Sequence, residues 1–266
     1  MRTIMLEGNP SMARAGVWRH TIRFVPGLLV ALTFTQPLSA VAQVEVPAPL
    51  QTPVSVRWWH GAVMLGGLSA LMLIDHPSQQ LFQRHRTGEA NDLASTLRHF
   101  GQIEVYGTIT AGIVGAGLLS GNHELTRSGG RLAATLALAG AASSVAKLTL
   151  GRPRPDQSND ADGYVPFSGQ EAMPSGHTTM AFALATALSD DLHRPWASVG
   201  LYTLAAGVGW SRLNDNRHWL SDVAAGAVLG ITSAKVMNGR WRIFNLRPPT
   251  ILLGPKQAGI AWQLAF

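Results

Sequence analysis

Apolar segments with helical spacing recur along most of this 266-residue chain. They are separated by stretches rich in Gly, Pro, Asp and Asn, which end helices and form turns. The pattern predicts six helices, at about residues 57–74, 91–119, 132–150, 177–188, 197–210 and 219–237. The longest connection, 151–174, contains four prolines and a group of acidic residues, so we expect an irregular loop there.

The C-terminal residues follow a different pattern. Apolar residues 251–253 are followed by Gly254-Pro255-Lys256-Gln257 and then by apolar residues at every second position from Ile260 to Phe266. Two such runs joined by a Gly-Pro turn predict a β-hairpin. A membrane barrel would need about eight strands, and only two fit here. We therefore predict an all-α fold, a compact bundle of about six helices with a small C-terminal β-hairpin.

The N-terminal residues have the organisation of an export signal. A positively charged region precedes a short apolar stretch at 24–34, and Ala40-Val41-Ala42 offers a small-x-small cleavage site before Gln43. The arginines of this region are Arg14, Arg19 and Arg23. An uncleaved anchor is the alternative, although a proline and a threonine make the stretch a poor span. We expect a signal peptide at 1–42, an extended leader at 43–56, a helical domain at 57–240 and a tail at 241–266.

Composition narrows the class of protein. Hydrophobic residues make up 46% of the chain and charged residues only 14%, which excludes disorder for most of it. The absence of cysteine excludes disulfide scaffolds, thiolate metal sites and cysteine nucleophiles. The net charge of +6 includes no basic run, so we do not expect a nucleic-acid partner. Anionic small molecules and lipid head groups fit this charge equally well.

The lengths of the apolar segments bear on the membrane question. Their uninterrupted apolar cores are mostly 12 to 17 residues long, as at 61–74 and 132–146, and they are rich in Ala and Gly. A transmembrane helix needs about 20 residues. These lengths favour the buried helices of a soluble or peripheral bundle. A multi-pass inner-membrane protein is the alternative.

Three polar clusters lie at the ends of the predicted helices. They are Lys147-x6-Arg154-Pro155, Pro174-Ser175-Gly176-His177 and Ser211-Arg212-x5-His218-x3-Asp222. Buried cations are costly without partners, so three of them at helix ends call for an anion with several oxygens, such as phosphate. The free N–H groups of a helix that starts at Ser175-Gly176 would also bind an anion.

The histidines add the chemistry of group transfer. His218 and Asp222 are four residues apart, so they share one face of a helix. An Asp in that position fixes the imidazole tautomer and leaves the outer ring nitrogen free to attack. His177, at the mouth of the anion site, can give a proton to a leaving oxygen. Each cluster alone has an ordinary structural explanation, as a surface pair, a helix stop or a cap. Together and in this order they favour a catalytic site.

These clusters resemble the three motifs of the type 2 phosphatidic acid phosphatase (PAP2) superfamily. Those motifs are Lys-x6-Arg-Pro, Pro-Ser-Gly-His and Ser-Arg-x5-His-x3-Asp, and this sequence matches all eleven defined positions. The resemblance covers about residues 90–237. The superfamily includes bacterial acid phosphatases, lipid phosphatases and vanadium haloperoxidases. The resemblance implies an all-helical core with the active site at one end.

The resemblance also implies roles for individual residues. His218 would be the nucleophile that forms a phosphohistidine, Asp222 would orient it, and His177 would protonate the leaving group and later activate water. The phosphate oxygens would be held by Lys147, Arg154, Ser175, the Gly176 amide and Arg212. Arg152, within the repeat Arg152-Pro153-Arg154-Pro155, is a further candidate. The mechanism requires no metal and no other cofactor.

The leading hypothesis is a metal-independent phosphatase. Its substrates would be lipid phosphates such as phosphatidate, isoprenoid phosphates or pyrophosphates, or small soluble phosphate esters. One alternative is a vanadate-dependent haloperoxidase that holds vanadate in the same cradle. The other is a non-catalytic anion- or lipid-binding envelope protein. The sequence sets neither the leaving group nor the oligomeric state.

The order of the motifs predicts the topology of the domain. The third and fifth predicted helices end at the site, and the fourth and sixth begin there. The connection between the first and second helices should therefore lie at the site's end, and the start of the domain at the opposite end. With the export signal, we expect a periplasmic protein that is soluble or associated with the membrane surface.

Overall fold

The computed structural model describes residues 53–243, 250–254 and 257–261. By its contacts the chain divides into Met1–Pro47 and Ala48–Phe266, and every described residue belongs to the second unit. The predicted signal peptide therefore lies outside the described residues, as does most of the predicted leader. The domain boundaries drawn from the sequence stay predictions.

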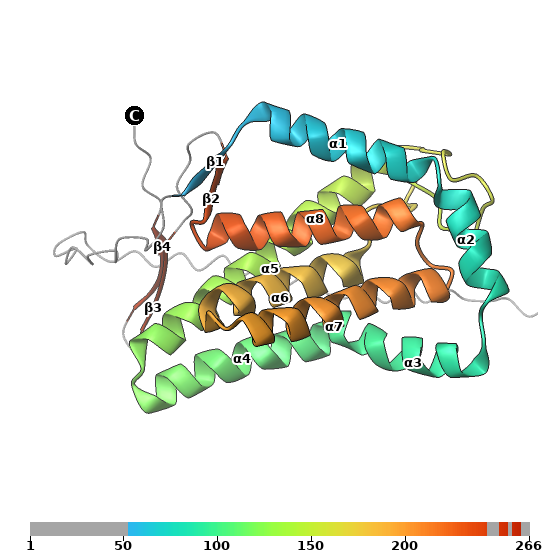
Figure 1. The fold of residues 1–266 in the computed structure, drawn as a ribbon. Helices are drawn as coiled ribbons and strands as arrows, with labels where there is room; N and C mark the ends of the chain where they lie inside the picture. Colours follow the sequence, from blue (N-terminus) through green and yellow to red (C-terminus); the bar gives the residue numbers. More distant parts are fainter. Residues whose placement is uncertain (1–52, 244–249, 255–256, 262–266) are drawn as a thin grey trace, which may run out of the picture. The chain divides into compact units, whose positions relative to one another are not determined.

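Eight α-helices form the described part of the chain, which confirms the all-α prediction (Figure 1). Their bounds are α1 Trp58–Met72, α2 Asp75–Arg84, α3 Gly88–Arg98, α4 Ile103–Ser120, α5 His123–Leu150, α6 Gly176–Leu192, α7 Pro195–Asn214 and α8 Leu220–Met237. A short 3-10 helix, η1 (His99–Gly101), separates α3 from α4. The difference from six helices arises because α2 was not predicted and because η1 divides the segment predicted at 91–119.

Helix ends follow the local chemistry of the sequence. Asn122 caps α5 by accepting a hydrogen bond from the Leu125 N–H at 3.0 Å, and Pro195 opens α7. Helix α5 ends at Leu150 and is capped by Gly151, whose φ of 56° lies in the left-handed region. A Cβ at Gly151 would also overlap the Val165 carbonyl, so only glycine fits where the loop returns to the helix.

Helix α6 is the centre of the bundle and contacts α5, α7 and α8 (Figure 1). Small residues line these contacts. Ala183 and Ala187 of α6 pack with Leu136 of α5 and Ala234 of α8, while other alanines of α6 pack against Val208 of α7. The Ala- and Gly-rich composition thus lets the helix backbones approach closely.

Two small β-pairs accompany the helices. Strands β3 (Thr250–Gly254) and β4 (Gln257–Ala261) pair antiparallel, from Thr250 opposite Ala261 to Gly254 opposite Gln257, which confirms the predicted hairpin. Its predicted continuation to residue 266 lies outside the described residues. Strands β1 (Val54–Val56) and β2 (Trp241–Ile243), which were not predicted, pair in parallel.

The β1–β2 pair also establishes the direction of the bundle. Strand β2 follows α8, so β1 lies at the C-terminal end of α8, opposite the end that carries Asp222. The first residue of α2, Asp75, lies at the other end, where its carboxylate accepts a hydrogen bond from the Ser221 N–H at 2.8 Å. The predicted topology is therefore confirmed. The connection after the first helix lies at the site's end.

Three of the described helices are long and apolar enough to cross a membrane, namely α4, α5 and α8. In α4 only 6% of the apolar window is buried within the protein, and Leu119 at its end is 92% exposed. These findings support a membrane-associated protein, which is one of the two forms expected from the sequence. Within α4, Thr110 donates its hydroxyl hydrogen to the Tyr106 carbonyl at 2.7 Å, which satisfies this polar group inside the helix.

Candidate active site

The three motifs meet where α5 ends and where α6 and α8 begin. The Ser175 N–H donates to the Asp222 carbonyl at 3.0 Å, which joins the second motif to the third. Lys147, in the last turn of α5, donates to the Glu171 carbonyl at 2.6 Å, just before the second motif. The predicted site residues are thus brought to one end of the bundle by helices separated widely in the sequence.

His218 lies just before α8 and is 5% exposed. Its Nδ1 is 2.7 Å from the Ala172 carbonyl oxygen, and a carbonyl only accepts, so Nδ1 carries the hydrogen. The other ring nitrogen, Nε2, therefore keeps its lone pair in the neutral ring. This is the tautomer that nucleophilic attack through Nε2 requires. Burial lowers the pKa of His218, against the opposing effect of the Asp222 carboxylate.

Asp222 contacts His218 less directly than the motif spacing predicted. Its Oδ2 is 3.7 Å from His218 Nδ1, which is within ion-pair range but too long for a hydrogen bond. The same oxygen accepts from the Trp219 N–H at 2.8 Å, and Oδ1 accepts from Arg152 at 2.6 Å. The Ala172 carbonyl therefore orients the ring, and Asp222 acts on it through its charge.

Arg152 belongs to a buried ion cluster and not to the anion cradle. Its guanidinium has no exposed surface, and it donates to Asp222 at 2.6 Å, to Asp75 at 2.7 Å and to the Ala161 carbonyl at 2.8 Å. It also donates to the Ser221 hydroxyl at 2.7 Å. These partners use both terminal nitrogens and Nε. The geometry therefore corrects the interpretation of Arg152 as an anion contact.

The remaining cations keep donors for a ligand. Lys147 uses one of its three donors on the Glu171 carbonyl, and Arg154 is 3.8 Å from the Glu171 carboxylate with part of its side chain exposed. Arg212 is 8% exposed, and one of its terminal nitrogens donates to Asp215 at 3.0 Å. Within the described residues the buried Nε of Arg212 has no partner, as expected of a donor that awaits an anion.

Ser175 and Gly176 open α6 as predicted. Ser175 is fully buried, and its hydroxyl oxygen accepts from Thr178 at 2.9 Å, which leaves its own hydroxyl hydrogen to donate. At Gly176 a Cβ would meet only the Lys147 side chain, at 3.8 Å. The first turn of α6 is therefore close to the lysine of the first motif.

His177 lies in the first turn of α6, where several positive charges act on it. Burial lowers its pKa to about 4, and the charges of Arg212, His218, Lys147 and Arg154 add to this effect in that order. These four residues belong to the first and third motifs, so residues of all three motifs lie near one another at His177. Without an anion the imidazole is neutral at pH 7.

Sequence reasoning missed several residues that complete the site. Asp75 anchors Arg152, Asp215 holds Arg212, and Ala172 orients His218 through its main chain. Asp215 has a visible signal, since it lies three residues after Arg212. Neither a main-chain carbonyl nor a distant partner such as Asp75 has one. No group of three or more His, Cys, Asp or Glu residues that could hold a metal ion occurs in the described ranges.

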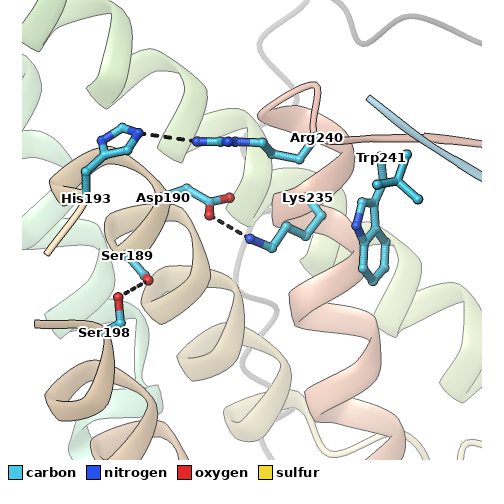
Figure 2. A pocket seen from close by; sticks show the side chains of 8 residues that line it. Ser189, Asp190, His193, Ser198, Lys235, Arg240 and Trp241 are labelled. Carbon is cyan, nitrogen blue, oxygen red and sulfur yellow. Dashed lines mark hydrogen bonds and ion pairs between the residues drawn. The ribbon is translucent and has the colours of Figure 1, made fainter. Parts of the chain in front are cut away.

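A separate cavity of about 380 Å³ lies at the opposite end of α6 (Figure 2). Its polar groups pair with each other, since Asp190 contacts Lys235 at 2.6 Å and His193 accepts from Arg240 at 3.3 Å. The Ser189 and Ser198 hydroxyls are 2.6 Å apart in the same lining. None of the three motifs reaches this cavity, so it is not the site they predict.

Comparison with known proteins supports the motif assignment. Residues 128–244 match the family model of the PAP2 superfamily. A segment of 108 residues is 42% identical to the lipid A 1-phosphatase of Porphyromonas gingivalis, covering 40% of this chain and 22% of that protein. The chain thus spans about a fifth of the length of this curated relative.

Two solved structures are similar. The transmembrane PAP2 type phosphatidylglycerolphosphate phosphatase from Bacillus subtilis aligns with 68% of this chain and 92% of its own, at a TM-score of 0.55 and 18% identity. The fold is therefore shared with that protein. Aquifex aeolicus LpxE aligns with 60% of this chain and 91% of its own, at a TM-score of 0.49 and 21% identity. The resemblance seen in the motifs is confirmed, since residues 128–244 match the model of the PAP2 superfamily.

Proposed function

We propose that the protein is a metal-independent phosphatase of lipid phosphomonoesters that works through a phosphohistidine on His218. The observation that carries the proposal is the 2.7 Å hydrogen bond from His218 Nδ1 to the Ala172 carbonyl. It leaves Nε2 unprotonated beside a set of cations with free donors. A site that only bound anions would gain nothing from an oriented neutral imidazole.

The reaction has two displacements. His218 Nε2 attacks phosphorus, the bond from phosphorus to the ester oxygen breaks, and His177 gives a proton to the leaving oxygen. Water then attacks phosphorus with His177 as base, the P–N bond breaks, and inorganic phosphate leaves. Lys147, Arg154 and Arg212, with the Ser175 hydroxyl and the Gly176 amide, would hold the phosphate oxygens as charge builds on them.

The low pKa of His177 is compatible with a role as acid only when substrate is bound. The Arg212, Lys147 and Arg154 charges help to hold that pKa at about 4. A phosphate dianion among these cations opposes their field, so its binding raises the pKa of His177. The substrate would thereby supply the negative charge that lets His177 take up the proton it later donates.

The apolar surface favours a lipid over a soluble ester. Three described helices could span a membrane, and α5 is one of them and carries Lys147 of the site at its C-terminal end. A phosphate attached to a membrane lipid would be presented at such an end. The match to a protein named lipid A 1-phosphatase agrees with this substrate class. Export to the periplasm, expected from residues 1–42, is part of the proposal.

The test is phosphate release by the purified full chain in detergent micelles with EDTA present. We would compare a lipid phosphomonoester with p-nitrophenyl phosphate. His218→Ala should abolish release and the acid-labile phosphoenzyme, whereas His123→Ala, at an exposed histidine at the start of α5, should change neither. Release that persists in His218→Ala would overturn the mechanism. A preference for the soluble ester would overturn the substrate class.

A further inference from the structure

The ion cluster around Arg152 joins three separate segments beneath the site. Asp75 comes from the start of α2, Arg152 from the loop after α5, and Ser221 and Asp222 from the start of α8. All four side chains are fully buried. Asp75 accepts from Arg152 at 2.7 Å, from the Ser221 hydroxyl at 2.6 Å and from the Ser221 N–H at 2.8 Å. Every carboxylate oxygen of Asp75 is thus in use.

This cluster holds two carboxylates and one guanidinium, so its net charge is negative. Asp222 carries that charge to His218, from which it is 3.7 Å away. Without Asp75, Asp222 would be the only carboxylate paired with the Arg152 guanidinium, and the two opposite charges would cancel. With Asp75 present, the positive charge is shared between two carboxylates, and Asp222 keeps more of its negative potential at the imidazole.

The main chain of Arg152 supports the same ring from another side. The Arg152 carbonyl accepts from the Ala172 N–H at 3.0 Å, and the Ala172 carbonyl accepts from His218 Nδ1 at 2.7 Å. Arg152 is therefore connected to His218 twice, by charge through Asp222 and by hydrogen bonds through Ala172. Asp75 is one of the residues that hold the Arg152 side chain in place, and it binds the terminal nitrogen that Asp222 does not.

We infer that Asp75 is a positioning residue for His218, which acts through Arg152 and Asp222 to stabilise the imidazolium formed on phosphate transfer. The transfer step itself rests on the proposed function. When Nε2 bonds to phosphorus and Nδ1 keeps its hydrogen, the ring becomes a cation. Asp222 from α8 favours that cation, while Lys147 from α5, Arg212 from α7 and His177 from α6 oppose or compete with it. The surplus negative charge supplied by Asp75 offsets those groups.

The experiment uses Asp75→Asn in the full chain, with Asp191→Asn as the matched control. Asp191 pairs with Arg131 at 2.8 Å near the opposite end of α6. Asp75→Asn should lower kcat about 10- to 100-fold, the size of effect expected when an outer residue that supports a functional imidazole is removed. KM should stay close to wild type, because Asp75 does not belong to the anion cradle. The control should change neither quantity.

A second readout does not depend on turnover. The titration midpoint of His218, followed by NMR of the histidine-labelled protein, should move to lower pH in Asp75→Asn, because a negative charge near the ring has been removed. A role limited to folding would not move this midpoint in the folded fraction. An unchanged midpoint together with an unchanged kcat would overturn the inference.

Ser221→Ala covers the case in which Asp75→Asn does not fold. It removes the hydroxyl that donates to Asp75 at 2.6 Å and accepts from Arg152 at 2.7 Å, without changing any charge. A reduced kcat with KM retained would support the positioning role, and an unaltered kcat would overturn it. If the wild type releases no phosphate at all, the proposed function fails, while the His218 titration still decides the role of Asp75.

Discussion

Replacing Arg152 by methionine should destabilise the fold far more than the same change at Arg154. The two arginines are separated by a single proline, yet Arg152 is fully buried between Asp75 and Asp222, whereas Arg154 is partly exposed and 3.8 Å from Glu171. Methionine is close in length to arginine and carries no charge, so each variant mainly removes a guanidinium. The pair separates the structural role of Arg152 from the ligand-binding role proposed for Arg154.

The expected magnitudes follow from burial. Removing one partner of a buried ion pair costs about 3–5 kcal/mol, because the other charge stays buried without compensation. Arg152→Met leaves two such carboxylates, so a loss at the upper end of that range is expected. An exposed pair contributes about 0–1 kcal/mol, so Arg154→Met should unfold almost as the wild type does.

Thermal unfolding of the full chain in detergent would measure the difference. At about 2–4 °C per kcal/mol for a domain of this size, Arg152→Met should lower Tm by roughly 10–20 °C. Arg154→Met should leave Tm nearly unchanged while weakening the binding of vanadate, a phosphate mimic. Equal Tm values for the two variants would refute the assignment of Arg152 to a structural cluster.

Three further predictions concern the site and its packing. The NMR titration of His177 should have a midpoint near pH 4 in the free protein and a higher midpoint with bound vanadate; a midpoint unmoved by the anion would contradict the convergence of cations around it. Gly230→Ala should lower the free energy of unfolding by about 1–3 kcal/mol, because the added Cβ would overlap the Thr179 carbonyl. Gly200→Ala is the control and should leave thermal unfolding unchanged, since a Cβ there would have no neighbour within 4 Å. Equal stabilities of the two variants would argue against the tight contact between α6 and α8. Gly101→Ala would place a Cβ 2.8 Å from the His177 carbonyl oxygen, so steady-state kinetics should show a lower kcat, and an unaltered kcat would mean that η1 does not hold the start of α6.

The sequence predicted those parts of the fold that follow from local periodicity. Helices α5 to α8 and the C-terminal hairpin were expected because apolar spacing and turn residues are local signals. Helix α2 was missed because its residues are mostly polar and Pro77 looked like part of a loop. The structure places Pro77 in the first turn of the helix, where its missing N–H costs nothing.

The site was predictable where its chemistry is carried by side chains at fixed spacing. His218, His177 and Arg212 could be found in this way. Asp75 could not, because its relation to Arg152 exists only in three dimensions. The hydrogen bond from His218 to Ala172 was equally hidden, since any residue type can supply a main-chain carbonyl. The direct contact expected between His218 and Asp222 was inferred from helical spacing, but His218 lies just before α8 and not on it.

The parallel pairing of β1 with β2 has a consequence for the order in which the molecule assembles. In the sequence, β1 precedes the first helix and β2 follows the last. Pairing these strands before the helices form would close a loop of nearly the whole domain, at an entropic cost of about 5 kcal/mol. Three residue pairs cannot offset that cost alone. The strands should therefore pair only after the helices have brought them together. Slow amide hydrogen exchange at Val54, whose N–H donates to the Arg240 carbonyl at 2.9 Å, would then report that every helix between them is in place.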